Sequence, residues 1–399
     1  MARILIVGHT YYPDDPRIRR ETKALGEAGH ETTVVCLRRD GDRREESVDG
    51  VRIVRLPITR RRGSLMRYAW EYSSFLTLAI WVVLSEHLRK PYHIVQVWNL
   101  PDVLVLAAQL PRLLGAKVVL DYRDSTPDAF VSKYDTRGLA RRTTHRLLDW
   151  LERLSFLLSD HILTVHEPYR ERVMARGIPR ERTSVFLNFP DPRLFDPTKH
   201  AAAPKESGRF ILMYHGTVAP RFGIDIAIRA IARVREEHPE VLLKVYGEGD
   251  GLPALRQTIE RLGLSQQVEL AGFRTLAEIP SLILAADVGI VPVRRDVLED
   301  QVLSTKLLEY LAMGRPVIAS RRPILERYLD PESVLYYEFE DDAVLAQHIR
   351  LLLAEPARRQ GLATAGRRFM ARYQWSDLCG EYVDAVQALA GGGFERAPI

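Results

Sequence analysis

The sequence predicts an α/β protein built from two doubly wound domains, each with a parallel sheet. Short apolar runs typical of buried strands alternate with helical patterns, and this alternation occurs twice along the chain. A stretch without periodicity separates the two halves. At 399 residues the chain is long enough for two domains, each with its own core.

The first half opens with a strand, a polar loop and a helix. The apolar run at 3–8 predicts a buried strand, and a helical pattern follows at 16–28. Gly29 ends this helix, as a residue that tolerates the left-handed conformation should. The remaining elements expected here are strands at 32–37, 51–56, 93–98, 117–122, 160–166 and 183–187, and helices at 68–88, from Asn99–Asp102 to 114, and at 147–159.

The second half repeats the same alternation. Residues 189–209 are rich in proline and charge and lack periodicity, which is typical of a linker. We therefore place the first domain at 1–190, the linker at 191–209 and the second domain at 210–374. Strands are expected at 210–215, 241–246, 267–270, 287–293, 316–319 and 333–337, and helices at 224–237, 282–286, 305–313, 342–353, 356–373 and 375–389.

Composition excludes several classes of protein. The two cysteines, Cys36 and Cys379, lie far apart and suggest neither a disulfide framework nor a zinc site, so a cytoplasmic setting is expected. The apolar run at 3–8 is too short for a signal peptide and is expected to be a strand. The sequence shows no zinc-finger or homeodomain pattern and no aromatic interleaving typical of nucleic-acid binding.

The net charge is +5, and the basic residues gather early in the chain. Two interpretations stay open: an anionic partner such as a phospholipid surface or a diphosphate, or a solvated arginine-rich surface. The apolar run 75–84 is shorter than the roughly 20 residues that span a bilayer. It predicts either a helix buried against the sheet or, with the arginines before it, peripheral attachment to an anionic membrane. The early basic residues are Arg17, Arg19, Arg20, Arg38, Arg39, Arg43, Arg44, Arg60, Arg61, Arg62 and Arg67.

The stretch 303–320 carries the strongest functional pattern. Helical spacing at 305–313 stops at Gly314, and a short buried strand follows. Lys306 and Glu309 are three residues apart and so project from one face of the first turns. A helix N-terminus with a lysine suits a phosphate, and a glutamate one turn later can accept two hydrogen bonds from a ribose diol. The alternative is a salt-bridged surface helix before a core strand.

Taken in order along the chain, several motifs resemble the retaining glycosyltransferases of family 4, which have the GT-B fold. The family pattern is E-x7-E followed by A-x-G-x-P-V-I-A. Glu309 is the second glutamate of that pattern, whereas Gln301 replaces the first. The motifs that carry the resemblance are Gly29-His30, the loop at Asp124, Asn188, His215-Gly216, Gly247-x-Gly249, Gly272-Phe273 and residues 306–319.

The resemblance implies two Rossmann-like domains that face each other across a cleft, with a C-terminal helix at 375–392 crossing back to the first domain. The second domain would bind the nucleotide sugar. The family's arginine and lysine after the first glycine fall on Thr217 and Phe222, so Arg221 and Lys306 are the expected cations for the diphosphate. The other expected donor-binding residues are Gly216, Thr217, Gly247, Gly249, Phe273, Gln301, Thr305, Leu308 and Glu309.

In the first domain, the loop after strand 117–122 should line the ligand crevice, because it follows a strand's carboxyl end. Asp124 matches the last aspartate of the family's D-x-H-D, and we expect a catalytic role for it beside Arg221 and Lys306. Arg123 stands where the family has histidine and is expected to face a phosphate. Arg17 and Arg20 either meet a phosphate as well or are surface charge on the helix.

The implied activity is transfer of a sugar, with retention, from a UDP- or GDP-sugar to a saccharide or polyprenyl-diphosphate-linked acceptor in envelope or exopolysaccharide synthesis. No protein nucleophile, metal or other cofactor is expected, and nucleic acid is not an expected partner. The expected location is cytoplasmic, and the alternative is peripheral contact with the inner face of the cell membrane. Two alternatives remain open: a sugar-nucleotide epimerase of the same fold, and a catalytically silent scaffold that binds sugar nucleotides.

Overall fold

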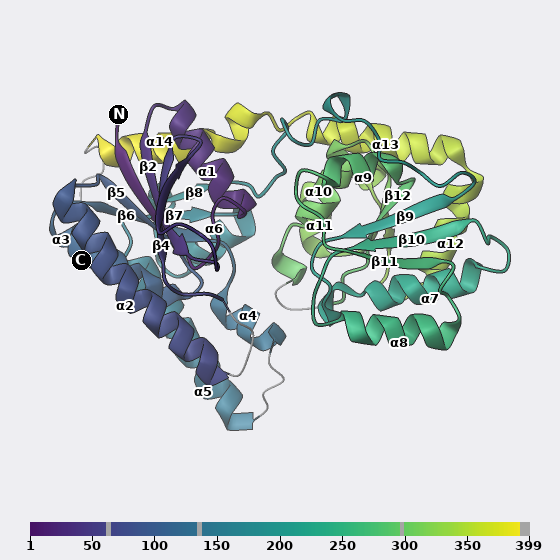
Figure 1. The fold of residues 1–399 in the computed structure, drawn as a ribbon, viewed down its shortest axis with the longest axis horizontal. Helices are drawn as coiled ribbons and strands as arrows, with labels where there is room; N and C mark the ends of the chain where they lie inside the picture. The colour runs from purple at the N-terminus through teal and green to yellow at the C-terminus, as the bar shows by residue number, and fades with distance from the viewer. Residues whose placement is uncertain (61–64, 134–137, 296–298, 392–399) are drawn as a thin grey trace. The chain divides into compact units, whose positions relative to one another are not determined.

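The computed structural model describes residues 1–60, 65–133, 138–295 and 299–391, so Arg61, Arg62 and residue 392 of the expected C-terminal helix lie outside the described residues. The chain divides into two compact units (Figure 1). The first comprises Met1–Asn188 and the residues from Ser376 onward, and the second comprises Phe189–Trp375. The stretch 191–209, expected as a linker, is counted with the second unit.

The first unit contains an eight-stranded sheet in the order β3-β4-β2-β1-β5-β6-β7-β8. All neighbouring strands are parallel except the pair β3 and β4. The order reverses between β1 and β5, which is where ligands bind in open α/β sheets. The strands are β1 (Arg3–Val7), β2 (Glu31–Leu37), β3 (Glu45–Val48), β4 (Val51–Leu56), β5 (Ile94–Trp98), β6 (Lys117–Tyr122), β7 (His161–Thr164) and β8 (Thr183–Val185).

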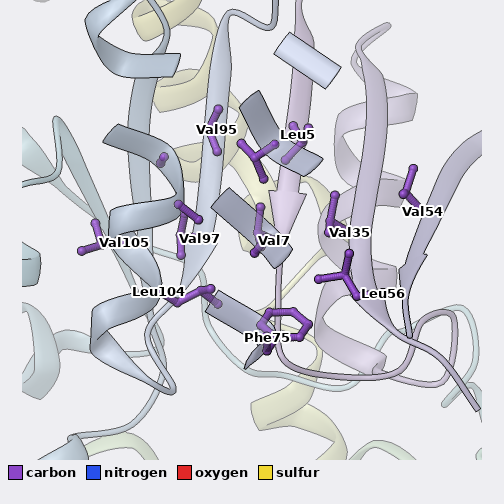
Figure 2. Close-up of a cluster of buried hydrophobic side chains, with 14 of the residues drawn as sticks. Leu5, Val7, Val35, Val54, Leu56, Phe75, Val95, Val97, Leu104 and Val105 are labelled. Atoms are coloured by element: carbon purple, nitrogen blue, oxygen red, sulfur yellow. The ribbon is translucent and has the colours of Figure 1, made fainter. Parts of the chain in front are cut away.

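The helices of the first unit cover its sheet and bury an apolar core. Phe75, Ala79 and Val83 of helix α2 are fully buried, because residues four apart fall on one face of a helix. Figure 2 shows Phe75 beside side chains of β1, β2 and β4. One side of the apolar run 75–84 therefore packs into the core, whereas Trp81 in the same run is exposed. The helices are α1 (Pro16–Glu27), α2 (Leu65–Arg89), the 3₁₀ helix η1 (Asp102–Ala108), α3 (Gln109–Leu113), α4 (Thr126–Lys133), α5 (Gly138–Leu157), α6 (Glu167–Ala175), the 3₁₀ turn η2 (Arg180–Arg182) and α14 (Trp375–Ala390).

Helix α14 completes the first unit although it comes last in the chain. The Tyr382 hydroxyl donates to the side-chain oxygen of Gln96, 2.8 Å away in β5. The Glu381 carboxylate accepts from the backbone N–H of Val185, at 2.9 Å. These contacts join the C-terminal helix to the first sheet.

The second unit contains a fully parallel sheet of six strands in the order β11-β10-β9-β12-β13-β14. Its order reverses between β9 and β12. The strands are β9 (Phe210–His215), β10 (Val241–Tyr246), β11 (Val268–Gly272), β12 (Val288–Val291), β13 (Val317–Ser320) and β14 (Leu335–Tyr337). The helices and 3₁₀ turns are η3 (Pro197–Lys199), η4 (Pro220–Phe222), α7 (Ile224–Val234), α8 (Leu252–Leu262), α9 (Ile279–Ala285), η5 (Glu299–Gln301), α10 (Thr305–Ala312), α11 (Pro323–Tyr328), η6 (Pro331–Ser333), α12 (Asp342–Ala354) and α13 (Pro356–Met370).

The two doubly wound sheets confirm the fold expected from the sequence, and four local expectations were wrong. The helix expected from Asn99–Asp102 to 114 is largely the 3₁₀ helix η1. The loop expected after β6 turns into helix α4 at Thr126, α5 begins at Gly138 instead of Leu147, and α11 was not foreseen. Thr126-Pro127 and Arg322-Pro323 illustrate the cause. Polar residues with proline are typical of loops, yet proline also favours the first turn of a helix.

Candidate functional site

The site of the second unit is built where β9 ends and α10 begins. Gly216 follows β9 with φ +113°, a backbone conformation that favours glycine. The stem of Lys306, the second residue of α10, lies against Gly216, and a Cβ there would overlap the Lys306 side chain. The glycine therefore leaves the space that Lys306 occupies, and it brings the two predicted residues together.

Two cations converge on the ring of Phe222. The Lys306 Nζ lies 4.2 Å from the centre of this ring, and the Arg221 guanidinium carbon lies 4.7 Å from it. Both are within the range of a cation–π contact. The structure thus places Arg221 and Lys306 in one cluster at the carboxyl end of the sheet. Phe222 joins them where the family has a lysine.

Arg294 fixes the turn that carries Arg221. Its backbone N–H donates to the Arg221 carbonyl at 2.9 Å, and its Nη1 donates to the Pro220 carbonyl at 2.7 Å. The same guanidinium pairs with both oxygens of Asp225, at 2.8 and 2.7 Å. A bidentate pair of this kind restrains geometry as well as adding energy. Arg294 was not singled out from the sequence.

Gly247 and Gly249 bring the loop after β10 against the loop after β9. A Cβ on Gly247 would overlap the Gly216 carbonyl, and a Cβ on Gly249 would overlap the carbonyl of Val218. The Val218 N–H also donates to the Glu248 carbonyl across this contact, at 2.9 Å. The geometry gives both glycines a packing role, and the ligand contacts expected of them stay predictions.

Glu309 contacts His215, which the sequence analysis named only as part of the motif His215-Gly216. Oε2 of Glu309 lies 2.5 Å from Nε2 of His215, the last residue of β9. Nδ1 of His215 lies 2.9 Å from the Tyr310 hydroxyl, which itself donates to the Met213 carbonyl at 2.8 Å. Both imidazole nitrogens of His215 therefore have a hydrogen-bonding partner, the Glu309 carboxylate on one side and the Tyr310 hydroxyl on the other. Its position at a strand's carboxyl end is a signal that could have found it.

The remaining predicted residues of this unit lie in different environments. Phe273, just after β11, is 63% exposed. Thr217 is exposed, and its carbonyl accepts from the Tyr214 hydroxyl at 2.6 Å. Gln301 and Thr305 are half-buried before and at the start of α10. Leu308 is fully buried, so its side chain belongs to the core in this structure and not to the group around Lys306.

In the first unit, Arg17 is buried and is not surface charge. Its side chain is only 4% exposed, and its guanidinium contacts both oxygens of Asp121, at 2.9 and 3.3 Å. It also donates to the Phe186 carbonyl at 2.8 Å and pairs with Glu21 at 3.0 Å. The interpretation of Arg17 as surface charge is therefore wrong. Buried carboxylates already surround its guanidinium, and the expected phosphate contact stays a prediction.

Arg20 is buried as well and donates to the side-chain oxygen of Asn188. Burial, together with repulsion from Arg17, lowers the pKa of Arg20 to about 10. The expectation of surface charge is therefore wrong for Arg20 too.

Arg123 is 13% exposed, and its guanidinium lies 3.3 Å from the ring centre of Trp98. It pairs with Asp121, with Asp15 at 3.4 Å and with Glu21 at 3.3 Å. Burial opposes ionisation of Asp121, but Arg123 and Arg17 hold the pKa of this carboxyl below its usual value. Carboxylates therefore surround Arg123, and its expected phosphate contact stays a prediction.

Asp124 is half-buried in the loop after β6, and the Asn99 amide fixes this loop. The amide nitrogen of Asn99 donates to the Asp124 carbonyl at 2.6 Å, and its oxygen accepts from the Arg123 N–H at 2.9 Å. Asn99 is 1% exposed and follows β5 directly. Sequence reasoning had taken it only as a helix start.

The described residues hold neither a candidate metal-ion cluster nor a membrane-spanning helix. They contain no group of three or more histidine, cysteine, aspartate or glutamate residues arranged to hold a metal ion. Among the helices of the described ranges, none is long and apolar enough to cross a membrane.

Two family models match the chain, one in each unit. The model "Glycosyl transferase 4-like domain" matches residues 15–188, and "Glycosyl transferases group 1" matches residues 195–369. The putative colanic acid biosynthesis glycosyl transferase WcaI of Escherichia coli is 23% identical over 344 residues, which is 78% of this chain and 81% of that protein. Alpha-D-kanosaminyltransferase of Streptomyces kanamyceticus is 24% identical over 217 residues, which is 53% of this chain. Apart from WcaI, the matches span only about half the length of the relatives, 54% in the kanosaminyltransferase.

Solved structures share the fold at low sequence identity. Sucrose-phosphate synthase of Thermosynechococcus elongatus superposes with a TM-score of 0.78 at 18% identity, covering 98% of this chain and all of that one. HepE of Anabaena in complex with UDP-glucose gives a TM-score of 0.69 at 14% identity, covering 97% of this chain and 100% of that one. These structures share the GT-B fold, and the two family models match both units, so the chain belongs to the group 1 glycosyltransferases of the family 4 type.

Proposed function

We propose that the protein is a glycosyltransferase that binds a nucleotide sugar at the carboxyl end of the second sheet. The observation that carries the proposal is the cluster in which Lys306 and Arg221 share the Phe222 ring. Glu309 lies one helical turn after Lys306 in α10. Two cations beside a carboxylate match the charges of a nucleoside diphosphate and the hydrogen-bonding needs of its ribose.

The donor would lie with its diphosphate between Arg221 and Lys306. Oε2 of Glu309 is held by His215, and we assign Oε1 to the ribose hydroxyls. Thr217, Gln301 and Thr305 line the sugar-nucleotide path, and Phe273 offers an exposed ring to the base. The base is uracil or guanine: HepE is described in complex with UDP-glucose, and a mycobacterial mannosyltransferase among the relatives is named for GDP-mannose.

The reaction we propose retains the anomeric configuration and needs no protein nucleophile and no metal. The bond between the anomeric carbon and the diphosphate breaks, and the acceptor oxygen bonds to the same carbon from the same face. The departing phosphate oxygen takes the acceptor's proton. Arg221 and Lys306 stabilise the charge that grows on the diphosphate as it leaves, which lowers the barrier because they are already in place.

The acceptor would bind to the first unit, where Asp124 and Arg123 follow β6. We propose a saccharide or a polyprenyl-diphosphate-linked saccharide used in cell-envelope or exopolysaccharide synthesis. The name of WcaI, which refers to colanic acid biosynthesis, supports this class of product. A cytoplasmic enzyme in peripheral contact with an anionic membrane would meet such an acceptor.

The test is release of UDP or GDP from a panel of nucleotide sugars, together with donor affinity measured by calorimetry. Glu309→Ala should weaken the affinity for the donor roughly 10- to 100-fold, since hydrogen bonds to a charged group contribute about 1.5–3 kcal/mol. Glu260→Ala is the matched control, because Glu260 is an exposed carboxylate on α8.

Equal donor affinity in the wild type and in Glu309→Ala would refute the assignment of this residue. A sugar nucleotide converted to its isomer would identify an epimerase instead. Donor binding without turnover in the presence of any acceptor would favour a silent scaffold, and no binding of any donor would refute the proposed site.

A further inference from the structure

The exposed apolar side chains of this protein are concentrated on one group of helices. Among the described residues, every large apolar side chain that is exposed lies on α2, η1–α3 or α5, apart from Met1, Phe273 and Leu114, which directly follows α3. Large apolar patches on a protein surface mark interaction sites. The residues are Met66, Trp70, Trp81 and Leu88 on α2, Leu106, Leu110 and Leu113 on η1–α3, and Leu147, Trp150 and Leu157 on α5.

On α2 these residues form one stripe. At 3.6 residues per turn, Met66, Trp70, Trp81 and Leu88 lie within about 60° of one another around the helix axis. They point away from the side that carries Phe75, Ala79 and Val83 into the core. Trp70 and Trp81 are each 68% exposed. Helix α2 is thus apolar on two opposite sides, and packing within the unit explains only one of them.

The charges on the same helices have one sign. Where side chains are described, every exposed charged residue of α2 and α5 is an arginine: Arg67, Arg89, Arg142, Arg146 and Arg153.

Three of the four described carboxylates of these two helices turn inward. Glu71, Glu86 and Glu152 are buried, and the half-buried Asp149 pairs with Arg176 at 2.5 Å. Glu152 accepts from the Tyr122 hydroxyl at 2.7 Å inside the core. The exposed surface therefore combines tryptophan, leucine and arginine. The one described carboxylate of α2 and α5 that reaches it, Asp149 at 45% side-chain exposure, is paired with Arg176.

The surface is continuous across the helices. Helix α2 packs against η1 and α3, and α5 packs against η1. Side chains of α2 and α5 also line one common pocket of about 180 Å³, with mainly apolar side chains in its wall. Its apolar lining includes Ala69, Leu76, Val103, Leu148 and Leu151.

We propose that the α2–α5 face docks on the surface of an anionic lipid bilayer. Tryptophan favours the interface between headgroups and acyl chains, while arginine pairs with lipid phosphates. The apolar pocket would receive part of an acyl chain. Two copies of this face would bring arginines against arginines, so a second copy of the chain is the weaker match. The proposal deepens the proposed function by naming the partner of the first unit, but it requires no glycosyl transfer.

The experiment is co-sedimentation of the full chain with vesicles. One set contains phosphatidylglycerol and phosphatidylcholine in equal parts, and the other contains phosphatidylcholine alone. We expect binding to the anionic vesicles that weakens as salt is added, because screening shortens the reach of the arginines. Tryptophan emission should shift to shorter wavelength on binding, as exposed indole rings leave water.

Two variants separate the two contributions. Trp70→Ser with Trp81→Ser should weaken vesicle binding roughly tenfold or more, because each ring loses apolar burial. Reversal of Arg142, Arg146 and Arg153 to glutamate should weaken it roughly tenfold or more, since each basic side chain near an anionic surface contributes about 1 kcal/mol. The matched control reverses Arg256 and Arg358, two exposed arginines of the second unit, and should leave binding unchanged.

Three results would overturn the proposal. They are equal binding to both kinds of vesicle, binding that persists in the tryptophan variant, and a self-association that the tryptophan variant abolishes. Donor affinity measured on the same preparations distinguishes this failure from failure of the proposed function. Vesicle binding without donor binding would refute the enzyme assignment alone, and donor binding without vesicle binding would refute the docking surface alone.

Discussion

The buried carboxyl of Asp102 makes the stability of the first unit depend on pH. Asp102 is 2% exposed in the first turn of η1, and one of its oxygens accepts from the Asn99 amide at 3.2 Å. Burial raises the pKa of this carboxyl to about 7 from 3.8. The group therefore stays protonated in the folded protein over a pH range in which the unfolded chain ionises.

The sign of the effect follows from this difference. As pH rises from about 4 to about 7, the folded state loses up to about 4 kcal/mol relative to the unfolded state through Asp102. We expect Asp102→Asn to remove this loss, so the variant's advantage in free energy of unfolding should grow across that window and then level off. Urea denaturation at a series of pH values measures it. Asp40→Asn, which changes an exposed carboxyl, should show no such trend.

Single residues also show what the sequence could and could not predict. That Lys306 and Glu309 share one face of α10 could be predicted from their spacing along the helix, and the family pattern pointed to Arg221; their roles stay predictions. The burial of Arg17 could not be predicted, since its partner Asp121 is far away in sequence and only the assembled sheet brings the two together. The contact between His215 and Glu309 was missed for the same reason.

At the scale of elements, the contact between the loops after β9 and β10 depends on glycine. Gly247→Ala should destabilise the protein by about 3 kcal/mol or more, because the added Cβ overlaps the Gly216 carbonyl at a φ of +154°. Gly361→Ala is the contrasting variant: this glycine lies within α13 and its Cβ would meet nothing within 4 Å. It should raise stability by about 0.5–1 kcal/mol. Thermal unfolding midpoints compare the two, and similar shifts in both variants would contradict the assigned loop contact.

Elements were predictable in proportion to their burial. The strands β6, β9 and β10 begin and end where the apolar runs begin and end, because each is enclosed on both faces of a parallel sheet. Short or amphipathic elements gave weaker signals. Helix α4 and the 3₁₀ helix η1 depend on neighbours such as α5 and α2, which no local pattern reveals.

At the scale of the whole molecule, binding of the donor should slow hydrogen exchange in the second unit only. If the nucleotide binds at the carboxyl end of the second sheet, hydrogen exchange should slow there when UDP or GDP is added. We expect the added protection at 216–223, 247–251 and 305–312, and none along β1, β5 or β6. Mass spectrometry of peptides from the labelled protein measures it, with free phosphate as the control ligand. Protection confined to the first sheet would contradict the proposed donor site.

The two-sheet architecture was predictable because alternating strands and helices admit few arrangements. Parallel strands joined by right-handed crossovers leave little choice once the alternation is seen. The strand order within each sheet and the burial of Arg17 and Arg20 could not be predicted from the sequence. Both depend on which elements pack together. A sequence pattern indicates such packing only when the two elements are also close in sequence.

Helix α14 has a consequence for synthesis of the protein. The first unit needs Tyr382 against Gln96 and Glu381 against Val185, yet the ribosome makes these residues only after the entire second unit. The second unit is one continuous segment and can fold as it emerges, since domains generally fold as units during synthesis. The amino-terminal sheet must instead wait with part of its surface uncovered, so the order of completion is the reverse of the order of translation.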